Sequence, residues 1–442
     1  MPSLAEHKWL RLLTLCLLYL AQGVPWGFVT FTLAAWFAAQ GMDGASLGAA
    51  LAITSLPWTL KFLWGPVVDR WTAPSLGRRR PWILLAQTMM VVSTLAILAV
   101  PDPIADLNLL VGLLFVHNVF SALQDVAVDA LAVDLLEEHE RGTANGLMYG
   151  FKYLGGGLGG AGLSKVMVSV GTEHGLQTAI AAQGLLLGVI LLFPLLLRER
   201  SGDRLLPFGA AQRTSGLGAV VGAGGADSPR SLRETLAILI RVFRLRSPAL
   251  GALFALTSSI SAGALGVIGT IFYVRHLGWA DAEYAQFAGG PALGMGLGGA
   301  FLGGWLSDRL GRKAVIIGSC LALAAVWFGF VAAQPYWEVK VVVKAFLLAE
   351  PLFMSMMAGG FFALCTDLSL PAVAATQFTA YMALSNFSAS LGQLVGGALD
   401  EVFSYPQLFL AAAVIQVVVA GSLFFVDPLQ ARRELGHEGE GG

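Results

Sequence analysis

The sequence predicts an all-α membrane protein with twelve transmembrane helices arranged in two six-helix bundles. The 442-residue chain is 56% hydrophobic and only 12% charged, whereas soluble domains carry about a quarter charged residues. Its apolar runs are about 20 residues long, which is the length that crosses a hydrocarbon core of about 30 Å as a helix. A polar interval near the middle of the chain divides these runs into two sets of six.

The predicted spans define four regions of the chain. The first six spans cover 12–36, 46–68, 81–100, 107–134, 143–168 and 176–197, and the last six cover 248–274, 284–306, 314–333, 341–365, 372–399 and 406–426. We therefore expect an N-terminal bundle over 1–197, a linker over 198–247, a C-terminal bundle over 248–427 and a tail over 428–442. The Gly/Ala-rich part of the linker predicts a flexible segment.

The end of the linker, "RSLRETLAILIRVFRLR", is basic and amphipathic. We expect it to lie along the membrane surface with Arg230, Arg233, Arg241 and Arg244 at the lipid headgroups. Binding of a partner by this segment is an alternative.

The distribution of Lys and Arg predicts the orientation of the chain. With the N-terminus inside, 21 of the 27 basic residues fall on the cytoplasmic side, as the positive-inside rule requires. We expect both termini in the cytoplasm and the bundles in a bacterial inner membrane. The basic residues are spread over several loops, so the sequence does not predict a nucleic-acid partner.

Two stretches of the chain match each other across the halves. Residues 304–313 read "GWLSDRLGRK", and residues 65–80 read "GPVVDRWTAPSLGRRR", the same pattern with a five-residue insertion before Gly77. Their aspartates are 239 residues apart, which indicates a duplicated six-helix unit. We expect the glycine to permit close helix approach and the basic residues to tighten the turn. The motif residues are Gly65, Asp69, Arg70, Arg78, Arg79, Gly304, Asp308, Arg309, Gly311 and Arg312.

This pair of motifs on twelve spans resembles the major facilitator superfamily. The segments "LYLAQGVPWGF" (18–28), "LPWTLKFLWGPVVDRWTAPSLGRRRPW" (56–82) and "SALQDVAVDALAVDLLEEHERGTANG" (121–146) resemble the AmpG-like muropeptide permeases and the related acetyl-CoA transporters. The chain departs from that pattern at Leu131 and Ala132, where an arginine is usual, and at Lys152, which also replaces an arginine. The resemblance implies that two bundles rock around a midplane site.

Three predicted spans of the first half carry charges within the membrane: Lys61 in the second, Asp125 and Asp129 in the fourth, and Lys152 in the fifth. Such charges cost about 2.5–3.5 kcal/mol each on insertion scales, so they pair or face a water-filled cavity. The two aspartates are four residues apart and share a helix face. We expect a proton relay in which Asp125 carries the proton and Asp129 is the static partner. A permanent ion-pair network that only joins the spans is the alternative.

Polar and aromatic side chains in other spans are candidates for binding a solute. They are Gln22, Trp26, Asn118, Gln124, Tyr153, Glu350, Gln377, Tyr381 and Asn386. Polar residues between membrane helices also serve as packing contacts, and Glu350 stands beside Pro351, where it either lines the cavity or marks a helix break.

The chain contains no zinc-protease, dithiol, nucleophile-elbow or P-loop motif, so we expect neither an enzyme nor a nucleotide-driven pump, and no cofactor or metal. The combined prediction is a monomeric, proton-coupled importer of a medium-sized polar solute such as a cell-wall muropeptide, with protons and the lipid bilayer as its other partners. The alternatives are uptake of a siderophore or another large solute, a drug or metabolite efflux antiporter, and a membrane receptor that does not transport.

Overall fold

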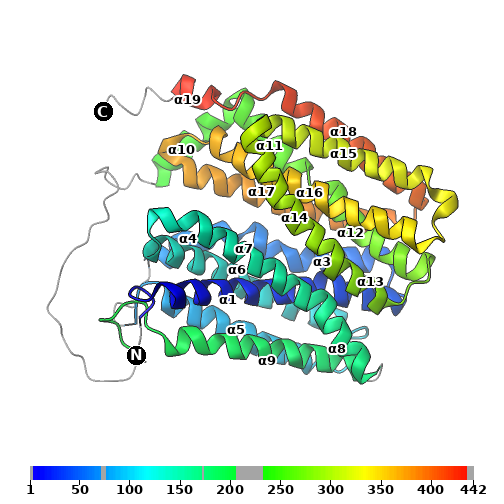
Figure 1. Ribbon diagram of the computed structural model, residues 1–442, viewed down its shortest axis with the longest axis horizontal. Helices are drawn as coiled ribbons and strands as arrows, with labels where there is room; N and C mark the ends of the chain where they lie inside the picture. The colour runs from blue at the N-terminus through cyan, green and yellow to red at the C-terminus, as the bar shows by residue number, and fades with distance from the viewer. Residues whose placement is uncertain (1–2, 71–75, 172–173, 206–231, 436–442) are drawn as a thin grey trace.

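The chain folds into two bundles of helices that lie side by side (Figure 1). The computed structural model describes residues 3–70, 76–171, 174–205 and 232–435. The start of α1 and the helix α19 lie at one end of the molecule, which we call the terminal end (Figure 1). Helices α8 and α13 lie at the opposite end, which we call the far end (Figure 1). The predicted all-α fold class is confirmed.

Six helical spans build the first bundle, and several of them are interrupted. The first span is α1 (Lys8–Gly27), the π-helical η1 (Phe28–Leu33) and α2 (Ala34–Ala39), and the second is α3 (Gly44–Thr59), the 3₁₀ turn η2 (Lys61–Leu63) and α4 (Trp64–Arg70). The others are α5 (Arg80–Leu98), α6 (Leu107–Leu135), α7–η4–α8 (Arg141–Gly157, Leu158–Gly162, Leu163–Val170) and α9 (Gly175–Leu196), with the turn η3 (Glu138–Glu140) before α7.

The second bundle follows the helix α10 (Leu232–Arg244). Its spans are α11–α12–η5 (Arg246–Thr257, Ile260–Ile271, Phe272–His276), α13–η6–α14 (Asp281–Phe287, Ala288–Ala292, Leu293–Leu310), α15 (Arg312–Ala332), α16 (Lys340–Leu368), α17 (Ala374–Leu399) and α18 (Tyr405–Ser422). Short turns η7 (Gln334–Tyr336), η8 (Pro371–Val373) and η9 (Leu423–Phe425) connect them, and α19 (Gln430–Leu435) ends the described chain.

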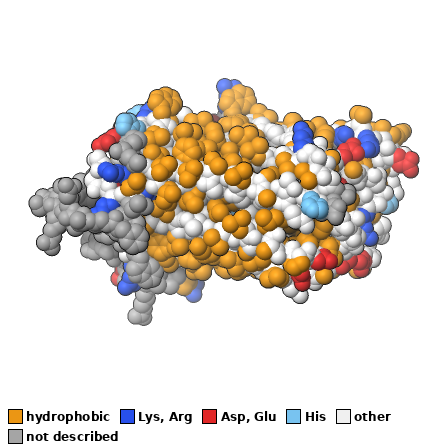
Figure 2. All heavy atoms as spheres, turned by 90° about the horizontal axis from the view of Figure 1, so that it is seen from below, with side chains coloured by type: hydrophobic (Ala, Val, Ile, Leu, Met, Phe, Trp, Pro, Cys, Tyr) orange, Lys and Arg blue, Asp and Glu red, His pale blue; other side chains and the backbone are white. Residues whose placement is uncertain are grey.

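Hydrophobic side chains surround the middle of the molecule. In Figure 2 they cover its central part, while most charged side chains lie toward its two ends. Within the described residues, nine helical segments are long and apolar enough to cross a membrane. Predicted spans five, eight and eleven are also helical but less apolar. These three pack against the opposite bundle through glycine, so less of their surface faces lipid.

The two bundles repeat each other at an offset of 233 residues. Helices α6 and α16 both have 29 residues and begin at this offset. The pair Arg79–Asp134 has its counterpart in Arg312–Asp367 at the same offset. The predicted duplication therefore has direct equivalents in side-chain contacts.

The described part of the linker joins the terminal end of both bundles. Glu199 accepts hydrogen bonds from the backbone N–H groups of Arg79 and Arg80. Val242 of α10 is buried against Leu370 and Val373 of the second bundle. The apolar face of the predicted amphipathic segment therefore covers the end of a bundle rather than only a lipid surface. The Gly/Ala-rich segment and the side chains of Arg230 and Arg233 lie outside the described residues.

Candidate functional site

A break in the second span places Lys61 inside the first bundle. The helix α3 ends at Thr59, and Lys61 opens the 3₁₀ turn that precedes α4. The cause is Pro66, because a proline ring in a helix clashes with the carbonyl group four residues earlier and lacks the N–H for a hydrogen bond. The break falls just before Pro66 and turns the Lys61 side chain toward α6.

Asp125 is the centre of the charged cluster. Its carboxylate lies 2.9 Å from Nζ of Lys61 and 3.8 Å from Nζ of Lys152, and its side chain is only 4% exposed. The two lysines are partly open to solvent, with 22% and 24% of their side chains exposed. Spans two, four and five are therefore joined by charge in this conformation.

Asp129 has a different environment one helical turn away. It accepts a hydrogen bond from the hydroxyl of Tyr19 in α1, and it is exposed. Tyr149 of α7 packs edge-on against Tyr19 with ring centroids 5.7 Å apart. Of the two carboxylates, Asp129 is the one in contact with solvent, and Asp125 is the one held by lysine.

Trp58 connects this cluster to the second bundle. Nζ of Lys152 lies 4.6 Å from the centre of its indole ring, a cation–π distance. Its indole N–H points to Oδ1 of Asn118 at 3.4 Å, and its carbonyl oxygen accepts a hydrogen bond of 3.0 Å from Asn386 in α17. Asn118, which was expected near Asp125, and Asn386 thus both contact Trp58 beside the cluster.

Tyr19, Tyr149 and Trp58 were not predicted from the sequence. A signal for Trp58 and for Tyr149 was available, because each precedes a lysine of the cluster by three residues and therefore lies near it on the same helix face.

The aromatic residues predicted in spans one and five also meet. Trp26 is partly exposed, and its ring centroid lies 6.5 Å from that of Tyr153. Gln22 is fully buried in α1, and neither its amide nitrogen nor its amide oxygen has a hydrogen-bond partner in the described structure.

Four predicted solute-binding residues lie elsewhere. Gln377 and Tyr381 are fully buried at the terminal end of the second bundle, where Gln377 bonds the backbone at Leu368 and Leu370. Gln377 satisfies backbone groups where α16 ends, and the Tyr381 hydroxyl donates to the carbonyl oxygen of Pro248 in α11, so both make their contacts within the second bundle in this conformation. Gln124 bonds Gln87 inside the first bundle. The neighbours of Glu350, namely Trp327, Tyr273 and Tyr284, all belong to the second bundle.

The repeated motif forms ion pairs at the terminal end of both bundles. Arg79 bonds Asp69 at 2.6 Å and Asp134 at 2.8 Å. Arg80 caps the end of α9 through the carbonyl oxygens of Pro194 and Leu195, as Lys313 caps the end of η9 at Val426.

This correspondence differs from the predicted alignment by one residue. Arg79, and not Arg78, is the equivalent of Arg312. Arg78 is half exposed, and its guanidinium lies 3.9 Å from the carboxylate of Asp69, farther than that of Arg79. The insertion in the first copy is therefore one residue longer than the sequence pattern indicated.

The motif glycines do not allow close helix approach in this conformation. A Cβ atom at Gly65 or at Gly304 would meet open space, contrary to the prediction. Gly311 has a positive φ of 86°, which favours glycine in the turn. Asp308 is exposed, and Arg309 stacks on Trp305 at 4.0 Å. Arg70 ends α4.

The bundles touch at the far end and diverge toward the terminal end. A Cβ at Gly160 would lie 2.8 Å from Cα of Gly289, and a Cβ at Gly48 would lie 2.9 Å from Cα of Gly397. Gly157 also faces Gly289, and Gly146, eleven residues earlier on α7 and therefore on the same face, has nothing within 4 Å of such an atom. On this span the contact between the bundles is therefore at the far end and not at Gly146.

Comparison with known proteins agrees with this architecture. The profile described as "Major Facilitator Superfamily" matches residues 15–392 and 251–441. A Rickettsia conorii protein named as an AmpG transporter is 22% identical over 424 residues, covering 94% of this chain and 96% of that protein. The anhydromuropeptide permease of Escherichia coli K12 is 34% identical over 129 residues, which cover 29% of this chain and 26% of the permease. The D-xylose–proton symporter has a similar fold, with a TM-score of 0.71 at 13% identity, covering 96% of this chain and 98% of that structure.

Proposed function

Because this chain belongs to the Major Facilitator Superfamily, we propose that it imports a medium-sized polar solute together with protons by alternating access. It is a multi-pass secondary transporter, and not an enzyme. The observation that carries the proposal is the cluster of Lys61, Asp125, Lys152 and Asp129 inside the membrane-spanning part of the first bundle. We infer that this cluster is open toward the terminal end, where Gly146 of the fifth span has no neighbour.

The contacts favour Asp129 as the residue that exchanges a proton with solvent. This is the reverse of the role expected from the sequence. Asp125 touches two lysines, so its charge is balanced in this conformation, whereas Asp129 touches only the neutral hydroxyl of Tyr19 among its described contacts. A carboxylate without a cationic partner and near a like charge takes up a proton more readily.

The solute is proposed to bind between this cluster and the second bundle. Trp58, Trp26 and Tyr153 offer aromatic surfaces, Asn118 and Asn386 offer amide groups, and Lys152 offers a positive charge. Aromatic rings with amides and a cation suit a molecule that carries sugar rings and carboxylates. A muropeptide has both, and the name of the Escherichia coli relative points to the same class.

The orientation completes the proposal. We place the terminal end in the cytoplasm of a bacterial cell, which makes the present conformation inward-facing. A siderophore or another large acidic solute would use the same contacts, and efflux would reverse the direction. A receptor that does not transport has no need for carboxylates and lysines facing a solvent-filled space.

Uptake of labelled solutes into proteoliposomes, with and without an imposed proton gradient, tests this function. The panel contains an anhydromuropeptide, a ferric siderophore and a nucleoside. We expect the anhydromuropeptide to accumulate only with the gradient, and Asp129→Asn to abolish accumulation while solute exchange at equal pH continues. Accumulation that persists in Asp129→Asn and after collapse of the gradient would disprove proton coupling.

A further inference from the structure

The core of the first bundle contains polar side chains that have unused hydrogen-bonding capacity. Nε2 of His117, the amide oxygens of Gln124 and Gln183, and both amide atoms of Gln22 are buried without a partner in the described structure. Each of the four side chains is at most 3% exposed. Buried polar groups are normally satisfied, and ordered internal water satisfies those that protein atoms do not.

These side chains follow the axis of the bundle on four helices. His117 lies seven residues after Leu110 on α6, and Gln124 follows after seven more, so all three share one face. On α5, Ser93 and Thr94 bond Nδ1 of His117 at 2.9 and 3.5 Å, and Gln87 bonds Gln124 further along. Gln183 on α9 and Gln22 on α1 are also buried in this bundle.

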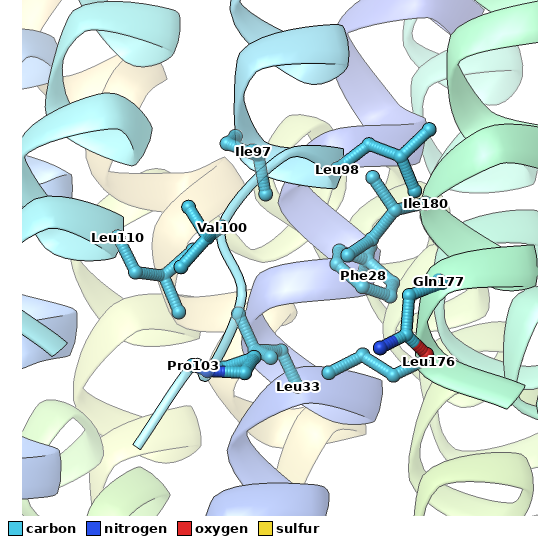
Figure 3. A pocket seen from close by; sticks show the side chains of 10 residues that line it. All are labelled: Phe28, Leu33, Ile97, Leu98, Val100, Pro103, Leu110, Leu176, Gln177 and Ile180. Atoms are coloured by element: carbon cyan, nitrogen blue, oxygen red, sulfur yellow. The ribbon is translucent and has the colours of Figure 1, made fainter. Parts of the chain in front are cut away.

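At the far end of this series, aliphatic side chains leave only a small apolar cavity. Its volume is about 10 Å³, and Leu110, Ile97, Leu33 and Ile180 line it together with one glutamine, Gln177 (Figure 3). Such a space holds one water at most, and apolar cavities stay dry. The residue that follows Gln124 at the other end of the series is Asp125 of the charged cluster.

The second bundle interrupts the corresponding series. At the offset of 233 residues, Gln87 and Gln124 are replaced by Cys320 and Met357, and both sulfur atoms contact Gln416, the counterpart of Gln183. The counterpart of Asp125 is Ala358. The counterpart of His117 is Glu350, so the second bundle has a carboxyl at that position, but Cys320, Met357 and Ala358 replace the residues that continue the series to an ion-paired aspartate in the first bundle.

We propose that this series is a proton path from the far end to the Asp125–Asp129 pair, separate from the space that the solute uses. The proposal rests on the proton coupling proposed above. Waters held by Gln22, Gln124 and Gln183 and the imidazole of His117 pass one proton at a time from oxygen or nitrogen to the next acceptor. The last acceptor is a carboxylate of the pair, which becomes a carboxylic acid.

The apolar cavity closes this path in the present conformation. The cluster is now open toward the terminal end, so a hydrated path would connect both sides of the membrane and dissipate the gradient. The ring of aliphatic side chains around Leu110 prevents this by excluding water.

Opening the ring by mutation tests the path without any solute. Leu110→Ser protein is reconstituted into liposomes that contain a pH-sensitive dye, and a potassium gradient with valinomycin drives protons inward. We expect proton influx to rise about tenfold or more over wild type, since each 1.4 kcal/mol removed from a barrier is tenfold in rate. Adding Gln124→Leu to Leu110→Ser interrupts the polar series between the ring and Asp125. We expect the double variant to return the influx to the wild-type level.

Matched variants keep the result interpretable. Val343→Ser makes the same kind of change at the counterpart of Leu110 in the second bundle, where Val343 is also buried, and we expect no added influx. Leu176 of α9 lines the same cavity, and Leu176→Ser is tested in place of Leu110→Ser if that variant does not elute as a folded monodisperse protein. Unchanged influx in the folded ring variants, influx that survives Gln124→Leu, or equal influx in Val343→Ser would each overturn the path. Gradient-independent uptake by the wild type would instead refute the proposed coupling.

Discussion

At the scale of single residues, the charged cluster is asymmetric. Asp125 is the only described carboxylate that contacts both Lys61 and Lys152, whereas neutralising either lysine leaves Asp125 in contact with the other. Removing one member of a buried ion pair is costly because it leaves a charge without a partner, by about 3–5 kcal/mol. The residue that balances two charges therefore matters more for stability than either lysine.

This asymmetry predicts the order of two substitutions. Asp125→Asn leaves two ammonium groups near each other and should lower the free energy of unfolding by about 3–5 kcal/mol. Lys61→Met should cost less, because Lys152 still lies 3.8 Å from Asp125. Thermal unfolding in detergent, followed by tryptophan fluorescence, measures both. The double variant should recover part of the loss, and equal effects of the two single substitutions would contradict the assignment.

A second prediction concerns Glu140, which lies between spans four and five. Hydrogen bonds from Lys8 and then Arg11 hold the pKa of its carboxyl below the ordinary value of 4.5. A carboxyl with a lowered pKa in the folded state contributes stability above its ordinary pKa and loses it as the pH falls through the folded value. Glu140→Gln should therefore unfold at a lower temperature than wild type at pH 7, and the difference should vanish as the pH falls well below 4.5.

Differential scanning fluorimetry across this pH range measures the effect of Glu140. Glu137→Gln is the control, because Glu137 is 71% exposed and contacts only His139 among the described ion pairs. A difference between wild type and Glu140→Gln that stays constant with pH would show that the ion pairs do not stabilise the fold.

Residue chemistry also explains which parts of the site the sequence could predict. Charges inside apolar spans are rare and therefore informative, so Lys61, Asp125, Asp129 and Lys152 could be found. Aromatic residues make up 10% of this chain, so Tyr19 does not stand out, and Trp58 is marked only by its spacing of three residues from Lys61. Gln377 resembled a solute ligand because a polar side chain that satisfies a helix end has the same sequence signature.

At the scale of secondary-structure elements, interruptions of the helices position the site. Hydropathy predicted the spans because only long apolar helices suit a bilayer. It could not predict where the second span breaks, which depends on Pro66, or the π-helical segments, one of which is joined to its neighbour by hydrogen bonds from Thr32 to the carbonyl oxygens of Gly159 and Gly160. The hydropathy of a span is an average, whereas these features depend on single backbone bonds.

The break before Pro66 predicts the effect of restoring a regular helix. Pro66→Ala returns the missing N–H and removes the ring clash, so the helix can run through residues 60–63 and turn Lys61 away from Asp125. We expect uptake to fall about tenfold, equivalent to a loss of about 1.4 kcal/mol in transition-state stabilisation. Gly65→Ala is the control, because an added Cβ there meets open space. Normal uptake by Pro66→Ala would mean that the break does not position the lysine.

At the scale of the whole molecule, small residues along the fifth span lie both where the two bundles touch and where they are apart. On the fifth span, Gly157 and Gly160 face Gly289 of the other bundle at the far end, whereas Gly146, on the same face as Gly157, has no neighbour at the terminal end. Alternating access requires the reverse arrangement in the other conformation, in which the terminal ends meet and the far ends separate.

This arrangement predicts opposite traps from the same substitution at two positions. Gly160→Leu cannot be accommodated in the present conformation, since its Cβ would lie 2.8 Å from the backbone of Gly289, so it should favour the state that is open at the far end. Gly146→Leu fits the present conformation and should block closure of the terminal end.

Spin-label distances between the two bundles, measured at each end, report the states. We expect the far-end distance to lengthen in Gly160→Leu and the terminal-end distance to remain long in Gly146→Leu even when solute is added. Both variants should lose net uptake, so only the distances separate the two traps. The same distance distribution in both variants would show that these glycines do not control which end is closed.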